Sequence, residues 1–183
     1  ANTTGTDNIA IGHNALAGNT TASNNTAVGD QALSTNSTGT ENTGFGYLAL
    51  AANTTAGYNT AIGSTALDAN TDGASNTAVG QSSLSTNTTG GFNTAVGRLS
   101  LYANTTASSN TAVGYNSLSA NTTGANNIAI GVSTLDANTT AHDNVAIGNA
   151  AMTASNSADN VAIGNLALTA LTTGAQNVAI GAL

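Results

Sequence analysis

The sequence predicts an all-β fold, a parallel β-solenoid in which each 17-residue repeat forms one coil. Three observations predict it. The pentapeptide Asn-x-Ala-(Ile/Val)-Gly recurs every 17 residues with one exception. One copy differs from it at two residues, Gly44 and Phe45. A large apolar residue occupies its fourth position in every copy. The segments between copies are rich in Asn, Thr and Gly, which favour turns. Stacked coils would place each residue about 4.8 Å from its counterpart in the next coil.

The repeat covers residues 1–183 as a single array of about ten and a half coils. Every interval is 17 residues, except for a 16-residue coil between Asn144 and Asn160. No change of composition marks a linker or a second domain. Because repeats run to both termini, we expect a segment of a longer fibre.

Each repeat is numbered here from the asparagine that opens the pentapeptide. Positions two to four carry Thr, Ile or Val around a small residue, a pattern typical of a short strand and unfavourable to helix. Glycine at position five fits a corner where a Cβ would collide or φ must be positive. Ala-Leu at positions eight and nine predicts a second short strand. The Asn-Thr-Thr-(Ala/Gly) segment that starts at position twelve predicts a turn.

The asparagine at position one is constant, and stacking would turn it into a ladder of side-chain amides. We interpret this ladder as structural. Its members are Asn8, Asn25, Asn42, Asn59, Asn76, Asn93, Asn110, Asn127, Asn144, Asn160 and Asn177.

Alternation along the strand places positions two and four on one side and position three on the other. We assign the large side chains to the coil core: Ile11, Val28, Phe45, Ile62, Val79, Val96, Val113, Ile130, Ile147 and Ile163 at position four, and Leu16, Leu33, Leu50, Leu67, Leu84, Leu101, Leu118, Leu135, Met152 and Leu168 at position nine. The opposite side is constantly small, which predicts close packing against another copy of the chain. This proposed inter-chain face comprises Ala10, Ala27, Gly44, Ala61, Ala78, Ala95, Ala112, Ala129, Ala146 and Ala162. Closed symmetric assemblies are the rule for homo-oligomers, so we expect a self-associating chain.

The composition excludes several classes of protein. Charged residues make up 5% of the chain, and one arginine and no lysine stand against eight acids, for a net charge of −7. A nucleic-acid partner would require a basic face. No apolar run approaches the length of a membrane-spanning helix, so we expect no membrane insertion in this segment. The absence of cysteine excludes disulfides and thiolate metal sites.

Groups that could carry catalysis do not converge in the repeat. Asp68 and Asp136 share position ten but lie four coils apart, too far for a glycosidase pair. Asp143 and Asp159 occupy equivalent places in adjacent coils, which suggests either a weak cation site or a solvated like-charge pair. His13 and His142 have no partner at metal-ligand spacing. We therefore predict no enzyme, no cofactor and no metal site.

Two further sets of residues are candidates for binding or modification. Tyr47, Tyr115, Tyr58 and Phe92 are aromatic side chains at variable positions, where they could bind sugars or a receptor. Candidate N-glycosylation acceptors recur at position twelve: Asn19, Asn36, Asn53, Asn87, Asn104, Asn121 and Asn138. The alternative for these asparagines is a purely structural role in the turn.

The segments Asn-Ile-Ala-Ile-Gly (8–12 and 127–131) and Asn-Val-Ala-Ile-Gly (144–148 and 177–181) resemble the head repeats of YadA-like trimeric autotransporter adhesins. The longer unit, with its Asn-Thr-Thr-Gly extension, also resembles shaft repeats of phage-type tail-fibre proteins. The resemblance covers essentially the whole chain, although adhesin head units are usually shorter. It implies a left-handed β-roll, a homotrimer, and an extracellular, cell-surface or virion location.

Together these observations predict a non-enzymatic shaft of an extracellular adhesin or phage tail fibre. Its role would be that of a stiff spacer displaying a region that binds a host-surface glycan or receptor. Two alternatives remain open at this point: an ice-binding solenoid, suggested by the regular Thr and Asn ranks, and a sugar-binding surface repeat. A tailspike depolymerase is disfavoured because no suitable carboxylate pair is seen.

Overall fold

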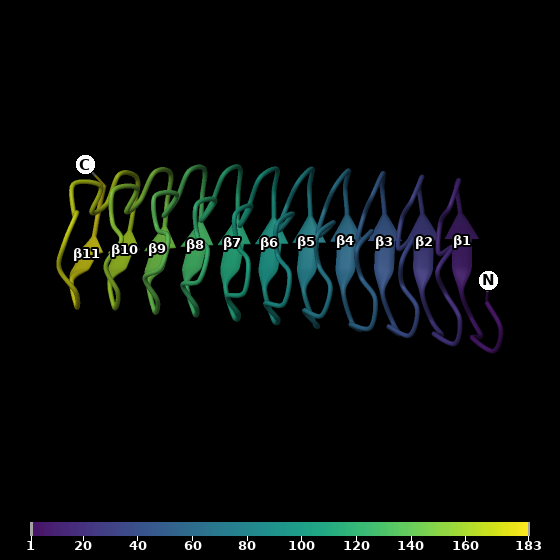
Figure 1. Ribbon diagram of the computed structural model, residues 1–183. Coiled ribbons are helices and arrows are strands. Elements are labelled where there is room, and N and C mark those ends of the chain that lie inside the picture. Colours follow the sequence, from purple (N-terminus) through teal and green to yellow (C-terminus); the bar gives the residue numbers. More distant parts are fainter. Residues whose placement is uncertain (1, 183) are drawn as a thin grey trace.

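The computed structural model describes residues 2–182, and within them it contains strands and turns but no helix. Each repeat contributes one three-residue strand, and the strands lie side by side along a rod (Figure 1). The strands are β1 (Ile9–Ile11), β2 (Thr26–Val28), β3 (Thr43–Phe45), β4 (Thr60–Ile62), β5 (Thr77–Val79), β6 (Thr94–Val96), β7 (Thr111–Val113), β8 (Ile128–Ile130), β9 (Val145–Ile147), β10 (Val161–Ile163) and β11 (Val178–Ile180).

All eleven strands form one parallel sheet in the order β1 to β11. The pairing is in register, so that each strand residue lies beside its counterpart one repeat away, as Thr77 does with Thr94. The 16-residue coil keeps this register, since Val145 pairs with Val161. The predicted fold class, a parallel β-solenoid with one coil per repeat, is therefore confirmed.

The orientation of the strand is opposite to the one predicted. The small residues at position three point into the coil, where Ala27, Ala61, Ala78, Ala95, Ala112, Ala129, Ala146 and Ala162 are fully buried and Gly44 is also buried, while Ala10 in β1 is exposed. The proposed inter-chain face is thus part of each chain's own core. The position-four residues assigned to the core lie outside it: Ile11, Val28, Phe45, Ile62, Val79, Val96, Val113, Ile130, Ile147 and Ile163 are half-buried or exposed.

The reason for this orientation is the narrowness of the coil. The predicted core position of the position-nine side chains is confirmed for Leu16 to Leu135 and for Met152, while Leu168 near the last strand is partly buried. These side chains form one cluster with the alanines of positions three and eight. A Cβ added to Gly44 would lie only 3.3 Å from Cγ of Leu33. A methyl group is therefore the largest side chain that fits between strand and leucine, which explains why position three is constantly small.

The second strand predicted at positions eight and nine is not formed. The chain instead makes a compact turn from position five to position eleven. Residues at positions seven and nine take a positive φ, as at Leu99 (58°) and Leu101 (51°), so the backbone cannot be extended there. Burial of the position-nine leucines offsets the cost of this left-handed conformation.

Two asparagine ladders run through the interior of the rod. In the position-one ladder the backbone N–H of Asn42 donates to Oδ1 of Asn25 (2.9 Å), and the Nδ2 of Asn42 donates to the carbonyl of Ala56 (2.9 Å). In the position-twelve ladder the Nδ2 of Asn53 donates to Oδ1 of Asn36 (2.7 Å) and also to Ala56 (2.9 Å). Both ladders thus hold the same turn carbonyl, and they satisfy polar groups that would otherwise be buried without partners.

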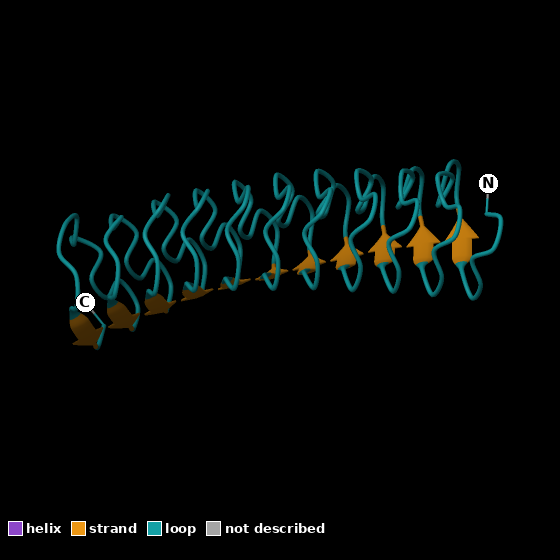
Figure 2. Ribbon diagram, turned by 60° about the horizontal axis from the view of Figure 1, so that its bottom comes forward, coloured by secondary structure: helices purple, strands orange, loops and turns teal. Residues whose placement is uncertain are grey.

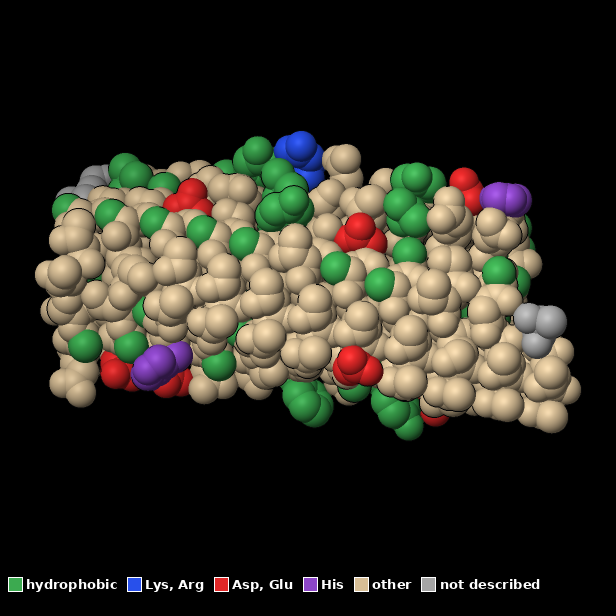
Figure 3. Space-filling view, viewed as in Figure 1, with side chains coloured by type: hydrophobic (Ala, Val, Ile, Leu, Met, Phe, Trp, Pro, Cys, Tyr) green, Lys and Arg blue, Asp and Glu red, His purple; other side chains and the backbone are tan. Residues whose placement is uncertain are grey.

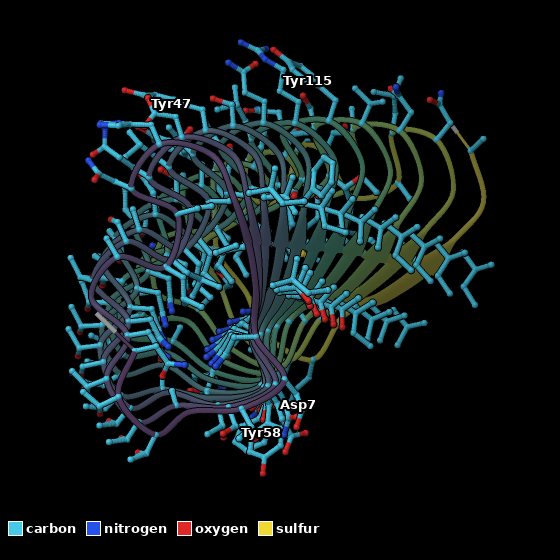
Figure 4. The ribbon with its side chains drawn as sticks, turned by 90° about the vertical axis from the view of Figure 1, so that its right-hand side faces the viewer. Asp7, Tyr47, Tyr58 and Tyr115 are labelled. Atoms are coloured by element: carbon cyan, nitrogen blue, oxygen red, sulfur yellow. The ribbon has the colours of Figure 1, made fainter. Side chains whose placement is uncertain are left out.

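The sheet twists along the rod. In Figure 2 the strand arrows turn from face-on at β1 through edge-on near the middle of the rod, and the end view in Figure 4 shows the strands fanned about the long axis. The right-handed twist of individual strands accounts for this rotation. As a result, the outer face of the sheet winds around the rod instead of lying in one plane.

Candidate functional surfaces

The outer face of the sheet is the longest uniform surface of the molecule. It is defined by positions two and four of β1 to β11, and its side chains project from the strands on the side away from the coil (Figure 4). Every residue in these two ranks is Thr, Ile, Val or Phe, and none is fully buried. The exposed fraction reaches 62% at Ile11, 53% at Phe45 and 75% at Ile180. This surface offers no charge, and its apolar position-four rank beside the threonine methyl and hydroxyl groups of β2 to β7 suits packing against another protein surface.

The opposite, turn-bearing side differs in character. Figure 3 shows it covered mainly by polar side chains and backbone, with hydrophobic and charged groups scattered singly or in small groups. The contrast between the two sides identifies the outer sheet face as the distinctive apolar surface of the rod.

The cluster of His142, Asp143 and Asp159 lies beside the 16-residue coil. One ligand atom from each residue lies within 4.8 Å of the other two, and all three residues are exposed. The Nδ1 of His142 is 2.7 Å from Oδ2 of Asp143, and hydrogen bonds from His142 and Asn126 hold the pKa of the Asp143 carboxyl below its ordinary value. Stacking brings the two aspartates together as the repeat predicted. The prediction that His142 has no partner at metal-ligand spacing is wrong, because its ring lies beside both carboxylates. Exposed acidic groups commonly gather without an ion, and we assign no metal to them.

The other titratable side chains are dispersed along the rod. The Nδ1 of His13 lies 3.1 Å from Oδ1 of Asp30 in the next coil, a pairwise contact that the sequence analysis did not predict. Ser85 donates a hydrogen bond to Asp68 (2.6 Å). Burial raises the pKa of the Asp136 carboxyl, and a hydrogen bond with its own backbone opposes this shift. These contacts are pairwise and local, and they assemble no nucleophile with a base.

The candidate glycosylation acceptors are enclosed by the fold. Asn19, Asn36, Asn53, Asn87, Asn104, Asn121 and Asn138 are all buried, at no more than 1% exposure. Each donates through its Nδ2, as Asn104 does to Asn87 (2.8 Å) and Ala107 (3.0 Å). A glycan on this nitrogen would remove a ladder bond and could not fit inside the coil. The interpretation of these residues as glycosylation sites in the folded protein is therefore wrong, and they form the second ladder.

The aromatic side chains lie on the edges of the rod. Tyr47 and Tyr115 project from one edge, and Tyr58 projects from the corner that also carries Asp7 (Figure 4). The guanidinium of Arg98 lies 5.7 Å from the centre of the Tyr115 ring, a cation–π contact between adjacent coils. A shallow hollow at the last coil is lined by Leu168 and Val178 among others.

Comparison with protein-family models, with curated proteins and with solved structures gave no match to this chain. Among residues 2–182 there is no helix of a length and apolarity suited to crossing a membrane. The assignment of function therefore depends on the geometry of the surfaces just described.

Proposed function

We propose that the chain is a non-enzymatic structural shaft of an extracellular adhesin or phage tail fibre, assembled as a homotrimer through the outer sheet face. The observation that carries this proposal is the exposed outer sheet face, where an unbroken apolar rank at position four runs along β1 to β11. The rank beside it at position two is Thr in β2 to β7 and Ile or Val in the other strands. A stiff rod built from eleven similar rungs would act as a spacer that displays a binding region.

The energetics of the outer sheet face favour a covered surface. Burying a fully exposed Ile or Val contributes about 1.5–3 kcal/mol, so covering a half-exposed side chain contributes roughly 1 kcal/mol. Each rung adds one such side chain at position four, and β1 and β8 to β11 add a second at position two, so the gain grows with the length of the rod. Since neither rank carries a charge, association would bury no unpaired ion.

The twist of the sheet favours a sister rod as the partner. A second solenoid of the same twist can wind along the outer sheet face over many rungs, whereas a flat solid meets only a few of them (Figure 2). The ice-binding alternative is disfavoured for this reason. It is also disfavoured because the position-two threonine rank gives way to Ile9, Ile128, Val145, Val161 and Val178 towards the ends.

Light scattering coupled to size-exclusion chromatography tests the proposal directly. We expect a mass near three chains for the native protein. Replacing Val79 and Val96 by aspartate places two charges in the middle of the outer sheet face, and we expect this variant to dissociate. The matched control, Ser64→Asp with Gln81→Asp, adds the same charges at position six and should keep the native mass. A clean monomer of the native chain at micromolar concentration would overturn the proposal.

A further inference from the structure

Position seventeen, the residue just before each position-one asparagine, forms one corner rank of the rod. Its backbone is left-handed in every coil, with φ between 58° and 63°. Nine of the residues at this position are polar or acidic and two are aromatic, Tyr58 and Phe92. The polar members are Asp7, Asn24, Glu41, Ser75, Ser109, Asn126, Asp143, Asp159 and Gln176.

The two aromatic residues are unfavourable choices for this conformation. A left-handed backbone is tolerated best by Gly, Asn and Asp, while bulky side chains adopt it at a cost. The leucines of position nine recover that cost by complete burial, but Tyr58 is 60% exposed and Phe92 is 70% exposed. A left-handed backbone whose conformational cost is not offset by burial of the side chain is expected where that side chain binds a ligand.

The spacing of the two rings is fixed by the fold. Tyr58 and Phe92 lie two coils apart in the same rank, with Ser75 between them, so their backbones are separated by about 9.6 Å along the rod. The backbone N–H of Ser75 donates to Gly57 (3.2 Å) and that of Phe92 to Ala74 (3.1 Å), which holds these rungs rigidly together. In Figure 3 two hydrophobic groups stand out from the lower edge of the rod, and Figure 4 places Tyr58 on this lower side.

The surroundings of the rings are small and polar. Beside them at position sixteen stand Gly57, Ala74 and Gly91, whereas Thr40 and Ser108 occupy that position in the flanking coils. The turn that leads to Ser75 carries the exposed Asp72, whose carboxylate accepts a hydrogen bond from the hydroxyl of Thr55 (3.1 Å). The region therefore combines two exposed aromatic side chains with hydroxyl and carboxylate groups that can bond to ligand hydroxyls.

We propose that Tyr58 and Phe92 form a platform that binds a neutral β-1,4-linked glycan lying along the rod. In such an extended chain successive pyranose rings are turned over, so every second ring presents the same face. The length of that disaccharide repeat is close to two rungs of the solenoid. The apolar C–H face of one ring stacks on Tyr58, and that of the next but one stacks on Phe92. Ser75 and Asp72 are then placed to bond hydroxyls of the sugar between them.

The charge of the protein decides between classes of glycan. Eight acids and one base give a field that repels polyanions, and Glu41 and Asp72 are on or beside the platform. Uronic-acid and sulfated chains are therefore disfavoured, and neutral glucans or N-acetylated glucosamine polymers are favoured. This platform is separate from the outer sheet face, and its function does not depend on trimer formation.

Binding to microcrystalline cellulose and chitin beads, with titration calorimetry on soluble hexasaccharides of both polymers, tests the proposal. We expect the native chain to bind at least one of them. Tyr58→Ala and Phe92→Ala should each weaken binding about tenfold, as for other stacking platforms, and the double variant should abolish it. Tyr47→Ala removes an aromatic ring that is 50% exposed at position six and should leave the affinity unchanged.

A variant that moves one ring tests the spacing itself. Exchanging Ser75 and Phe92, as Ser75→Phe with Phe92→Ser, keeps both aromatic rings but places them one rung apart, and binding should be lost. Phe92→Tyr keeps the platform and should retain the native affinity. The proposal is wrong if the native chain binds none of these probes, or if the double alanine variant binds as well as the native chain. The mass by light scattering should stay native in every one of these variants. A loss of glycan binding at unchanged mass therefore tests the platform alone, independently of the shaft proposal.

Discussion

At position five of each repeat the residue must be glycine for two independent reasons. The backbone φ lies between 129° and 141° at this position, a region that L side chains rarely adopt. The coils also approach so closely that a Cβ on Gly80 would lie 2.6 Å from the carbonyl carbon of Gly97. Both parts of the sequence-based expectation for this glycine, the collision and the positive φ, are therefore confirmed.

Replacing Gly80 by alanine should destabilise the protein by at least about 2 kcal/mol, since it adds left-handed strain to a backbone collision. The free energy of unfolding in urea, measured at fixed protein concentration, checks this. Gly91→Ala is the matched control, because its φ is not positive and alanine already stands at the equivalent Ala74 and Ala125. Equal losses in the two variants would contradict the argument.

The partly buried carboxyl of Asp136 gives a pH-dependent prediction. Burial raises its pKa in the folded state above the ordinary value that it has in the unfolded chain. Between the unfolded-state pKa and the folded-state pKa, the folded protein binds more protons than the unfolded chain. The free energy of unfolding therefore falls as pH rises through that interval. At neutral pH the ionised carboxylate is therefore slightly destabilising.

Asp136→Asn should raise the free energy of unfolding at pH 7 by roughly 0.5 kcal/mol, a small value because solvent screens the group. This gain should disappear as pH falls below the ordinary aspartate range. Thermal unfolding of the native chain and the variant from pH 3 to pH 8 measures the difference. Asp68 occupies the same position, but its carboxylate accepts a charge-assisted hydrogen bond from Ser85. Asp68→Asn replaces that carboxylate by a weaker amide acceptor, so it should give no gain.

At the scale of a single coil, the 16-residue repeat shows how the solenoid absorbs a deletion. In ordinary coils a backbone carbonyl at position thirteen accepts hydrogen bonds from the preceding coil, as Thr139 does from Thr122 and Thr123. In the shortened coil the side chain of Asn156 takes over, and its Oδ1 accepts from Thr139 (3.0 Å) and Thr140 (3.1 Å). The position-twelve ladder ends here, because Ser155 replaces the asparagine that would bond Oδ1 of Asn138.

Asn156→Ala should leave the N–H groups of Thr139 and Thr140 without a protein partner and destabilise this coil by about 2 kcal/mol. Asn156→Asp keeps the acceptor and should cost less. Amide hydrogen exchange measures both, and faster exchange should be confined to the neighbourhood of residues 139–141. Thr105→Ala removes the side chain at the same position of an ordinary coil, where the backbone carbonyl still accepts, so exchange at Thr88 and Thr89 should remain slow.

On the scale of the whole molecule, each rung contacts only its neighbours, so stability is shared along the rod. This makes the single basic residue a probe of the assembly. Arg98 is exposed, but its carbonyl accepts from Asn116 (3.1 Å) and the next N–H, of Leu99, donates to Gln81 (3.1 Å). Cleavage after Arg98 therefore requires several rungs to open together.

We expect native protein to resist trypsin for hours, and protein unfolded in urea to give two fragments, 1–98 and 99–183. Gel electrophoresis with mass spectrometry follows the digestion. The variant Val79→Asp with Val96→Asp should be cut faster if the outer sheet face is covered in the assembly. Rapid cleavage of the native chain would show that the rungs open independently.

Which chemical groups come together was only partly readable from the repeat. The intervals alone place Asp143 beside Asp159 and Tyr58 two rungs from Phe92. The same intervals place His13 beside Asp30, since both occupy position six, although the contact was not predicted. The intervals do not show that His142 reaches Asp143 and Asp159, because the turn sets how residues at different positions of the coil meet. The burial of position twelve was likewise invisible, since an Asn-Thr-Thr turn can present its asparagine inward or outward.

By itself the sequence determined the parallel β-solenoid, the register of its strands, the asparagine ladder of position one and the glycine corner. These features follow from the repeat period alone. When coils of equal length stack along one axis, each residue lies beside the residue at the same repeat position in the next coil, whatever the shape of the coil. Only the tertiary structure decided which side of the strand faces inward. That choice depends on the width of the coil, where the leucine rank leaves room for a methyl group and no more, and it turns the large β-branched side chains outward.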